Sequence, residues 1–287
     1  MTVEPFFLSV GGRSRFCLYH PSASSSMASR GAIVYIHPFA EEMNFSRRMA
    51  ALQSRALAAQ GYAVLQIDLL GCGDSAGDFS EAGWSDWVAD IVAAARWVQS
   101  RHSGGGAIPL TFWGLRAGCL LAAEAASAMD EPVDFLFWQP VLSGDLYWRQ
   151  FKRLAVAADA LKKHDAAGEN HAGRVTKPVA AIDAAIEIAG YCISPALVAG
   201  LSAARLTLPE CTRRVRCIEV STGQAPDAAA LSPALAAAVT AWCEQGKNVN
   251  SRVVPGPAFW QIAEAEDCPT LRAATAQLLA EDGNDSA

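Results

Sequence analysis

The chain has 287 residues, of which 52% are hydrophobic, and its formal net charge is -6. That length suits one α/β domain with a modest insertion, and the apolar share is sufficient for a large core. The Lys and Arg residues are scattered through an acidic chain, so the clustered basic surface that phosphate backbones require is missing and we expect no nucleic-acid partner.

The apolar segments and the cysteines indicate the compartment. No segment reaches the run of ~18 apolar residues that a membrane-spanning helix needs. The first residues, MTVEPFFLSVGGRSRF, show no basic stretch followed by a long apolar run, so no secretory signal is expected. The eight cysteines form no C-x-x-C pair and the five histidines lack metal-ligand spacing. We therefore predict a cytoplasmic protein with no disulfide, metal or cofactor.

The first half of the chain alternates predicted strands and helices. Apolar-rich residues 5–10 and 14–19 flank Gly11-Gly12, which predicts an antiparallel hairpin. The elements expected next are a strand at 31–39, a helix at 44–59, a strand at 63–71, a helix at 84–101, a strand at 108–115, a helix at 117–129 and a strand at 133–141. In the helix at 84–101, one face carries the apolar side chains of Trp87, Ile91, Ala94 and Val98.

After the strand at 133–141 the alternation stops, and we interpret residues 143 to about 208 as a cap insertion. Then follow a strand at 214–221, a helix at 232–246, a strand at 249–257 and a helix at 266–281. Strands that alternate with helices imply a mostly parallel sheet with right-handed crossovers. The expected organisation is one α/β domain over residues 1–287 that carries this cap.

Three stretches resemble landmarks of the α/β-hydrolase superfamily. HPFAEE, at 37–42, follows a predicted strand where that family has its oxyanion loop, and DLLGCGDSAG, at 68–77, resembles the family's D-x-R-G-x-G-x-S loop. GLRAG, at 114–118, stands where the family has the G-x-S-x-G nucleophile elbow. The resemblance covers nearly the whole chain. It implies an α/β-hydrolase fold, with a mostly parallel sheet flanked by helices, an N-terminal antiparallel hairpin and a small helical cap insertion.

A narrower set of motifs resembles the type 2 hydrolase-like proteins associated with the exosortase A system. These motifs are HPFAEEMN, DLLGCGDS, WGLRAG, FWQPVLSG, EIAGYCIS and VPGPAFW. The resemblance implies a bacterial setting, in exopolysaccharide production and in the sorting of PEP-CTERM proteins. It implies no particular reaction, because the word hydrolase in that name describes the fold.

Two of the three residues of a serine triad are missing from their expected places. A triad needs a nucleophile, a histidine base and an orienting acid. The nucleophile position holds Arg116, whose protonated guanidinium cannot attack an acyl carbon. The loop that should carry the histidine reads PGPAFWQ, at 255–261, and no histidine follows His171. Asp227 is a loose candidate for the acid. We therefore expect no hydrolysis by a serine triad.

Arg116 is the main candidate for a binding residue. Together with the amides of the helix N-terminus, its guanidinium can hold a carboxylate or a phosphate. The alternative is a structural ion pair with Glu41 or Glu42 of the oxyanion-type loop, and a ligand can displace such a pair. His37 is expected either to contact the ligand as a proton donor or to hydrogen-bond its own loop. The remaining expected ligand-binding residues are Phe39, Leu115, Trp138 and Trp260. For the two tryptophans the alternative is packing in the core or the cap.

Three functions follow. The first is a non-hydrolytic protein that binds an anionic small molecule, or a lipid-linked or sugar-linked intermediate, through Arg116. The second is an ester or thioester hydrolase or an acyltransferase with a displaced nucleophile such as Ser75, Cys119 or Ser143. For Ser75 the structural alternative is hydrogen bonding within its loop, and for Cys119 it is burial. The third function is a scaffold that binds another protein of its pathway through the cap.

Overall fold

The computed structural model describes residues 2–23, 29–102, 108–153, 185–188, 190–223, 230–264 and 266–281. Its strands are β1 (Glu4–Val10), β2 (Arg13–His20), β3 (Gly31–Ile36), β4 (Tyr62–Ile67), β5 (Leu110–Leu115), β6 (Val133–Trp138), β7 (Ile186–Ile188), β8 (Tyr191–Ile193), β9 (Thr212–Ser221) and β10 (Asn248–Pro255). Its helices are α1 (Glu41–Ala59), α2 (Trp84–Ser100), α3 (Gly118–Ser127), α5 (Pro195–Ala203), α6 (Pro233–Glu244), the 3-10 helix η3 (Phe259–Gln261) and α7 (Pro269–Glu281). Residues 144–153 are also helical.

Eight strands form one sheet in the order β1-β2-β4-β3-β5-β6-β9-β10. The β1–β2 and β2–β4 pairs are antiparallel, which confirms the N-terminal hairpin. All the other pairs in this sheet are parallel, which confirms the mostly parallel sheet. The carboxyl ends of the parallel strands therefore meet at one edge, where open α/β sheets bind their ligands.

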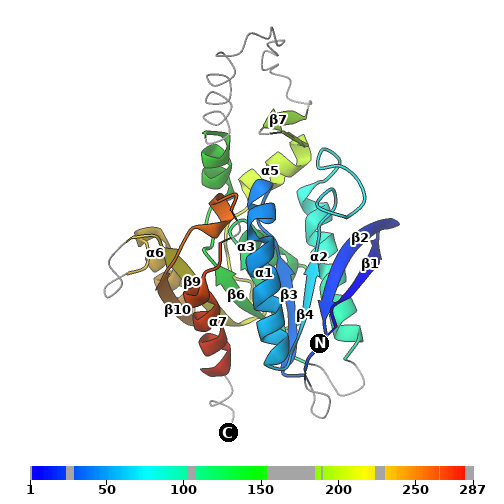
Figure 1. The fold of residues 1–287 in the computed structure, drawn as a ribbon. Coiled ribbons are helices and arrows are strands. Elements are labelled where there is room, and N and C mark those ends of the chain that lie inside the picture. Colours follow the sequence, from blue (N-terminus) through cyan, green and yellow to red (C-terminus); the bar gives the residue numbers. More distant parts are fainter. Residues whose placement is uncertain are drawn as a thin grey trace.

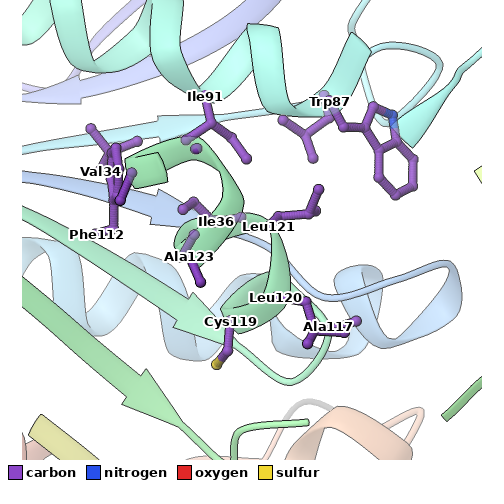
Figure 2. Close-up of a cluster of buried hydrophobic side chains, with 14 of the residues drawn as sticks. Val34, Ile36, Trp87, Ile91, Phe112, Ala117, Cys119, Leu120, Leu121 and Ala123 are labelled. Carbon is purple, nitrogen blue, oxygen red and sulfur yellow. The ribbon is translucent and has the colours of Figure 1, made fainter. Parts of the chain in front are cut away.

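Helices pack on both faces of this sheet (Figure 1). One hydrophobic cluster joins the sheet to α1 and α7 through side chains such as Met49 and Leu271. A larger cluster on the other face joins it to α2 and α3, and Figure 2 shows Trp87, Ile91 and Leu121 in it. The predicted apolar face of α2 is buried in this second cluster. Both layers hold the carboxyl edge of the sheet in a fixed position.

Three predicted boundaries were wrong close to the expected site. The strand predicted at 31–39 ends at Ile36, and the helix expected from 44 begins at Glu41. Glu41 and Glu42 therefore lie in the first turn of α1 and not in a loop. The helix dipole favours acidic side chains in that first turn. The strand predicted at 63–71 ends at Ile67, because a turn follows in which Gly71 and Gly73 adopt positive φ values of 73° and 53°.

The described part of the insertion between β6 and β9 consists of the helix at 144–153, the antiparallel β7–β8 pair and α5. An isolated bridge between Ser143 and Arg205 joins the two ends of the insertion. The extent of the cap, to about residue 208, stays a prediction, because residues 154–184 lie outside the described ranges. In those ranges, no helix is both long enough and apolar enough to cross a membrane.

Candidate functional site

The turn between β5 and α3 has the geometry of a nucleophile elbow, with an arginine at its apex. Arg116 has a φ of 56°, in the left-handed region that residues other than glycine rarely adopt. Its amide donates to the carbonyl of Trp138 at 3.0 Å, and its carbonyl accepts from the amide of Cys119 at 3.1 Å. The neighbouring strand and the following helix thus hold the strained residue in place.

The two glycines of GLRAG are required by close approach of the backbone. A Cβ atom on Gly118 would lie 2.4 Å from the carbonyl oxygen of Ile36. A Cβ atom on Gly114 would lie 2.7 Å from the Cα atom of Cys119. Both distances are too short for any side chain, so these glycines allow α3 to start directly against the sheet.

The side chain of Arg116 forms an ion pair with Glu42. Its Nε and Nη2 atoms both donate to Oε1 of Glu42, each at 3.3 Å. The hydroxyl of Tyr147, on the helix at 144–153, donates to the other carboxylate oxygen of Glu42 at 3.0 Å. Only 13% of the Arg116 side chain and 11% of the Glu42 side chain are exposed. Arg116 was expected to pair with Glu41 or Glu42, and the structure shows that the pair forms with Glu42.

Two aromatic rings also contact the guanidinium of Arg116. Its central carbon lies 5.5 Å from the ring centre of Tyr147 and 5.6 Å from that of Trp260, within the range of cation–π attraction. Trp260 belongs to η3, in the loop after β10 where a triad histidine was sought. An aromatic ring therefore packs against the elbow from the loop that should carry the base.

Burial shifts the pKa values of the groups around Arg116. Removal from water raises the pKa of the Glu42 carboxyl, although Arg116 and the Tyr147 hydroxyl oppose the shift. Burial raises the pKa of Tyr147 well above its ordinary value, and the negative charge of Glu42 is the second-largest cause of this rise. Tyr147 therefore stays protonated and acts as a hydrogen-bond donor to Glu42.

A cavity of about 230 Å³ opens beside the elbow. Its polar lining residues are Arg116, Gln139, Ser143, Tyr147, Gln150, Glu219 and Ser232. Oε2 of Glu219, in β9, accepts a hydrogen bond from the amide of Ser232 at 2.7 Å. Gln139 follows β6 with a φ of 45°, and its Oε1 accepts from the amide of Val220 at 2.7 Å. Among the residues that the structure describes, the cavity therefore carries one cationic and one anionic side chain.

His37 is buried and hydrogen-bonds its own loop. Its Nδ1 lies 2.8 Å from the carbonyl oxygen of Pro38, and its Nε2 accepts from the amide of Leu69 at 3.3 Å. This pattern defines a neutral ring that donates from Nδ1, and desolvation lowers the pKa of His37. His37 does not line the cavity. Both ring nitrogens are engaged by the backbone, so the structural alternative describes this residue.

None of the other expected ligand-binding residues lines the cavity. Phe39, Leu115 and Trp138 are core residues, and the indole N–H of Trp138 donates to Thr275 of α7 at 2.9 Å. Glu41 begins α1 and does not line the cavity. Trp260 does not line the cavity either, but its ring contacts the guanidinium of Arg116.

The candidate nucleophiles have structural roles or lack a base. The Ser75 hydroxyl donates to the Asp68 carbonyl at 2.5 Å and accepts from the Phe16 amide at 2.8 Å. Cys119 lies fully buried in the cluster of Figure 2, and burial raises its pKa well above the ordinary value. Ser143 lines the cavity and accepts from the Leu146 amide at 3.4 Å. No histidine within the described ranges hydrogen-bonds to any of the three, and Asp227 lies outside those ranges.

Sequence reasoning missed Tyr147, Gln139 and Glu219. Gln139 and Glu219 stand at or near the ends of adjacent parallel strands, and that position was the available signal for both. Tyr147 follows the strand in the cap, and its contact with Glu42 spans 105 positions of the chain, which local patterns do not reveal. In the described chain, no group of three or more His, Cys, Asp or Glu side chains is placed to hold a metal ion.

The family model described as serine aminopeptidase, S33, matches residues 27–187, which is more than half of the chain. Among curated proteins, the chain is similar to protein ABHD12B of Homo sapiens, with 33% identity over 105 residues. That match covers 36% of this chain and only 27% of the human protein.

Solved structures share the fold over almost the whole chain. An α/β serine hydrolase from Xanthomonas campestris has a TM-score of 0.55 at 14% identity and covers 96% of this chain and 92% of its own. Est1E from Butyrivibrio proteoclasticus, with bound ferulic acid, has a TM-score of 0.62 at 16% identity, with 96% and 98% covered. A soluble variant of monoglyceride lipase from Saccharomyces cerevisiae has a TM-score of 0.60 at 16% identity, with 98% and 96% covered. The fold is that of the α/β hydrolases, as expected.

We predict that Gly118→Ala destabilises the protein by about 1–3 kcal/mol, because the new methyl group overlaps the carbonyl of Ile36. Gly223→Ala is the matched control, since its Cβ would meet only the Ser221 hydroxyl oxygen at an ordinary 3.7 Å. Urea unfolding measures both variants. Equal midpoints for the two variants would contradict the close approach at the elbow.

The raised pKa of Glu42 predicts a pH dependence of stability. The folded protein holds this proton more tightly than the unfolded chain does, so the free energy of unfolding falls as the pH rises from the ordinary value of 4.5 through the raised value. In Glu42→Gln this contribution to the slope is absent. Urea unfolding over a series of pH values compares the variant with wild type, with the exposed Glu244→Gln as control. Parallel profiles for wild type and Glu42→Gln would refute this assignment.

Proposed function

This chain belongs to the serine aminopeptidase S33 family, and from that premise and the geometry of the elbow we propose that it is a non-hydrolytic member. In this proposal, the cavity beside the elbow binds an anionic small molecule through Arg116. The observation that carries it is the arginine at the position of the nucleophile. This arginine has a strained backbone conformation and forms an ion pair with Glu42.

The hydrogen-bond donors of Arg116 support an anionic ligand. A guanidinium has five N–H donors. The Nε–H and one N–H of Nη2 are engaged by Glu42, and no other described residue accepts from the guanidinium of Arg116. The pair with Glu42 uses the Nε and Nη2 side, so the fork formed by Nη1 and Nη2 is available. A carboxylate matches such a fork with two parallel hydrogen bonds, which also fixes its orientation.

The surroundings of Arg116 make it a rigid binding group. The ion pair with Glu42 and the rings of Tyr147 and Trp260 restrict the guanidinium before any ligand arrives. Binding then costs little side-chain entropy, which favours affinity. One guanidinium can hold two carboxylates, so the ligand need not displace Glu42.

The alternative of a displaced nucleophile rests on Ser143, because this serine lines the same cavity. A serine hydroxyl needs an adjacent general base to attack an acyl carbon. The contact recorded for the Ser143 hydroxyl is the amide of Leu146, which is a donor and not a base. Anion binding therefore explains more of the cavity than hydrolysis does, and an acyltransferase or esterase stays the second candidate.

The motif resemblance supplies the proposed biological setting. We place the protein in the cytoplasm of a bacterium, in a pathway for exopolysaccharide and exosortase-dependent sorting. The anionic ligand is then an intermediate of that pathway. A cap that also binds a pathway protein is compatible with this arrangement.

The binding claim can be tested with 4-methylpentanoate as probe and the uncharged 4-methylpentan-1-ol as comparison, by ligand-observed NMR. Wild type is expected to bind the acid more tightly than the alcohol. Arg116→Gln is expected to weaken binding of the acid by about 10-fold or more, because it removes a charge-assisted pair of hydrogen bonds. The exposed Arg149→Gln is the matched control and should bind as wild type does. Equal affinity of wild type and Arg116→Gln for the acid would refute the proposal.

A further inference from the structure

The cavity beside the elbow contains two opposite charges that do not pair with each other. Arg116 and Glu219 both line it, and within the described ranges no ion pair joins them, so their charged atoms are more than 4.0 Å apart. Arg116 directly follows β5, and Glu219 lies in β9, with β6 between those strands. Since neighbouring strands are ~4.8 Å apart, the two backbones are separated by about 10 Å. The side chains of Arg116 and Glu219 therefore reach the cavity from opposite sides.

Glu219 has no cationic partner among the described residues. Its Oε2 accepts a single hydrogen bond, from the amide of Ser232 at the start of α6, and no described donor reaches Oε1. A half-buried carboxylate is costly unless a cation or further donors satisfy it. An ammonium group in the cavity would supply both the charge and the donors.

Four aliphatic side chains line the cavity beside its polar groups. Val141, Leu142, Leu146 and Leu235 line the cavity, and Leu146 is 65% exposed at its edge. A volume of about 230 Å³ corresponds to about eight water molecules at ~30 Å³ each, which suits a molecule the size of leucine. The ligand should therefore have an aliphatic body.

We propose that the cavity binds a zwitterionic aliphatic amino acid, with its carboxylate on Arg116 and its ammonium on Glu219. This inference rests on the proposed function, because it assigns the anion at Arg116 to the carboxylate end of the ligand. It adds Glu219 as the residue that selects an amino acid over a simple carboxylic acid.

The test compares four probes by ligand-observed NMR. L-leucine and 6-aminohexanoate carry both charges, at short and long separation. In 4-methylpentanoate the ammonium of leucine is missing, and in 3-methylbutylamine the carboxylate is missing. Wild type is expected to bind at least one amino acid about 10-fold more tightly than either singly charged probe. The amino acid that binds better reports the distance between the two charged walls.

Glu219→Gln tests the new residue, because glutamine retains an oxygen for the amide of Ser232. It is expected to abolish the preference for the amino acid, while 4-methylpentanoate binds as in wild type or more tightly. Glu244→Gln, on the exposed side of α6, is the matched control and should preserve the preference. Circular dichroism melting verifies that both variants are folded.

The outcomes separate the inference from the proposed function. If 4-methylpentanoate binds wild type as tightly as both amino acids do, and requires Arg116, the amino-acid inference is wrong and the proposed function stands. If Glu219→Gln preserves the preference, the assignment of the ammonium to Glu219 is wrong. If neither the amino acids nor 4-methylpentanoate bind wild type, both the inference and the proposed function fail.

Discussion

The ion pair between Arg116 and Glu42 is the interaction on which the site depends. A charge that is largely removed from water must be paired, and loss of one partner leaves the other uncompensated. This pair joins the elbow after β5 to the first turn of α1, and the Tyr147 hydroxyl extends it to the helix at 144–153. Three segments that are distant in the sequence are thus fixed around one guanidinium.

The elbow shows that backbone geometry and chemistry are separable in this fold. Gly114 and Gly118 allow α3 to pass close to the sheet, and the positive φ of Arg116 follows from that turn whatever its side chain is. The same backbone can therefore present a nucleophile or a binding group. Function has to be argued from the side chains at the site, since one fold hosts many activities.

Strong local patterns made most of the fold predictable. The hairpin around Gly11-Gly12, the buried face of α2 and the parallel strands follow from turn residues and from apolar periodicity. The start of α1 was less predictable, because HPFAEE resembled a loop motif and no side-chain cap marks the helix start at Ala40. The prediction therefore placed Glu41 and Glu42 in a loop and left open which of them pairs with Arg116.

The site itself was only partly predictable. Arg116 was identified because its position in GLRAG contradicts the motif, and an arginine at that point must find a partner. Tyr147 reaches the cavity through tertiary packing between distant segments, which leaves no local pattern, and the signal for Glu219 was its position near the end of β9. Trp138 and Leu115 were assigned to the ligand because they end strands, whereas their side chains point into the core on the side of α1 and α7. Strand alternation decides that direction, and the motif does not.

The most direct test of the central claim is the intact mass of the protein after incubation with a fluorophosphonate probe, with an active esterase treated in parallel. A guanidinium occupies the position of the nucleophile, and within the described ranges no base hydrogen-bonds to the hydroxyl of Ser75 or Ser143. We therefore predict no mass gain while the esterase is labelled. A gain of one adduct, mapped by peptide analysis to a single serine, would show an activated nucleophile and contradict the account.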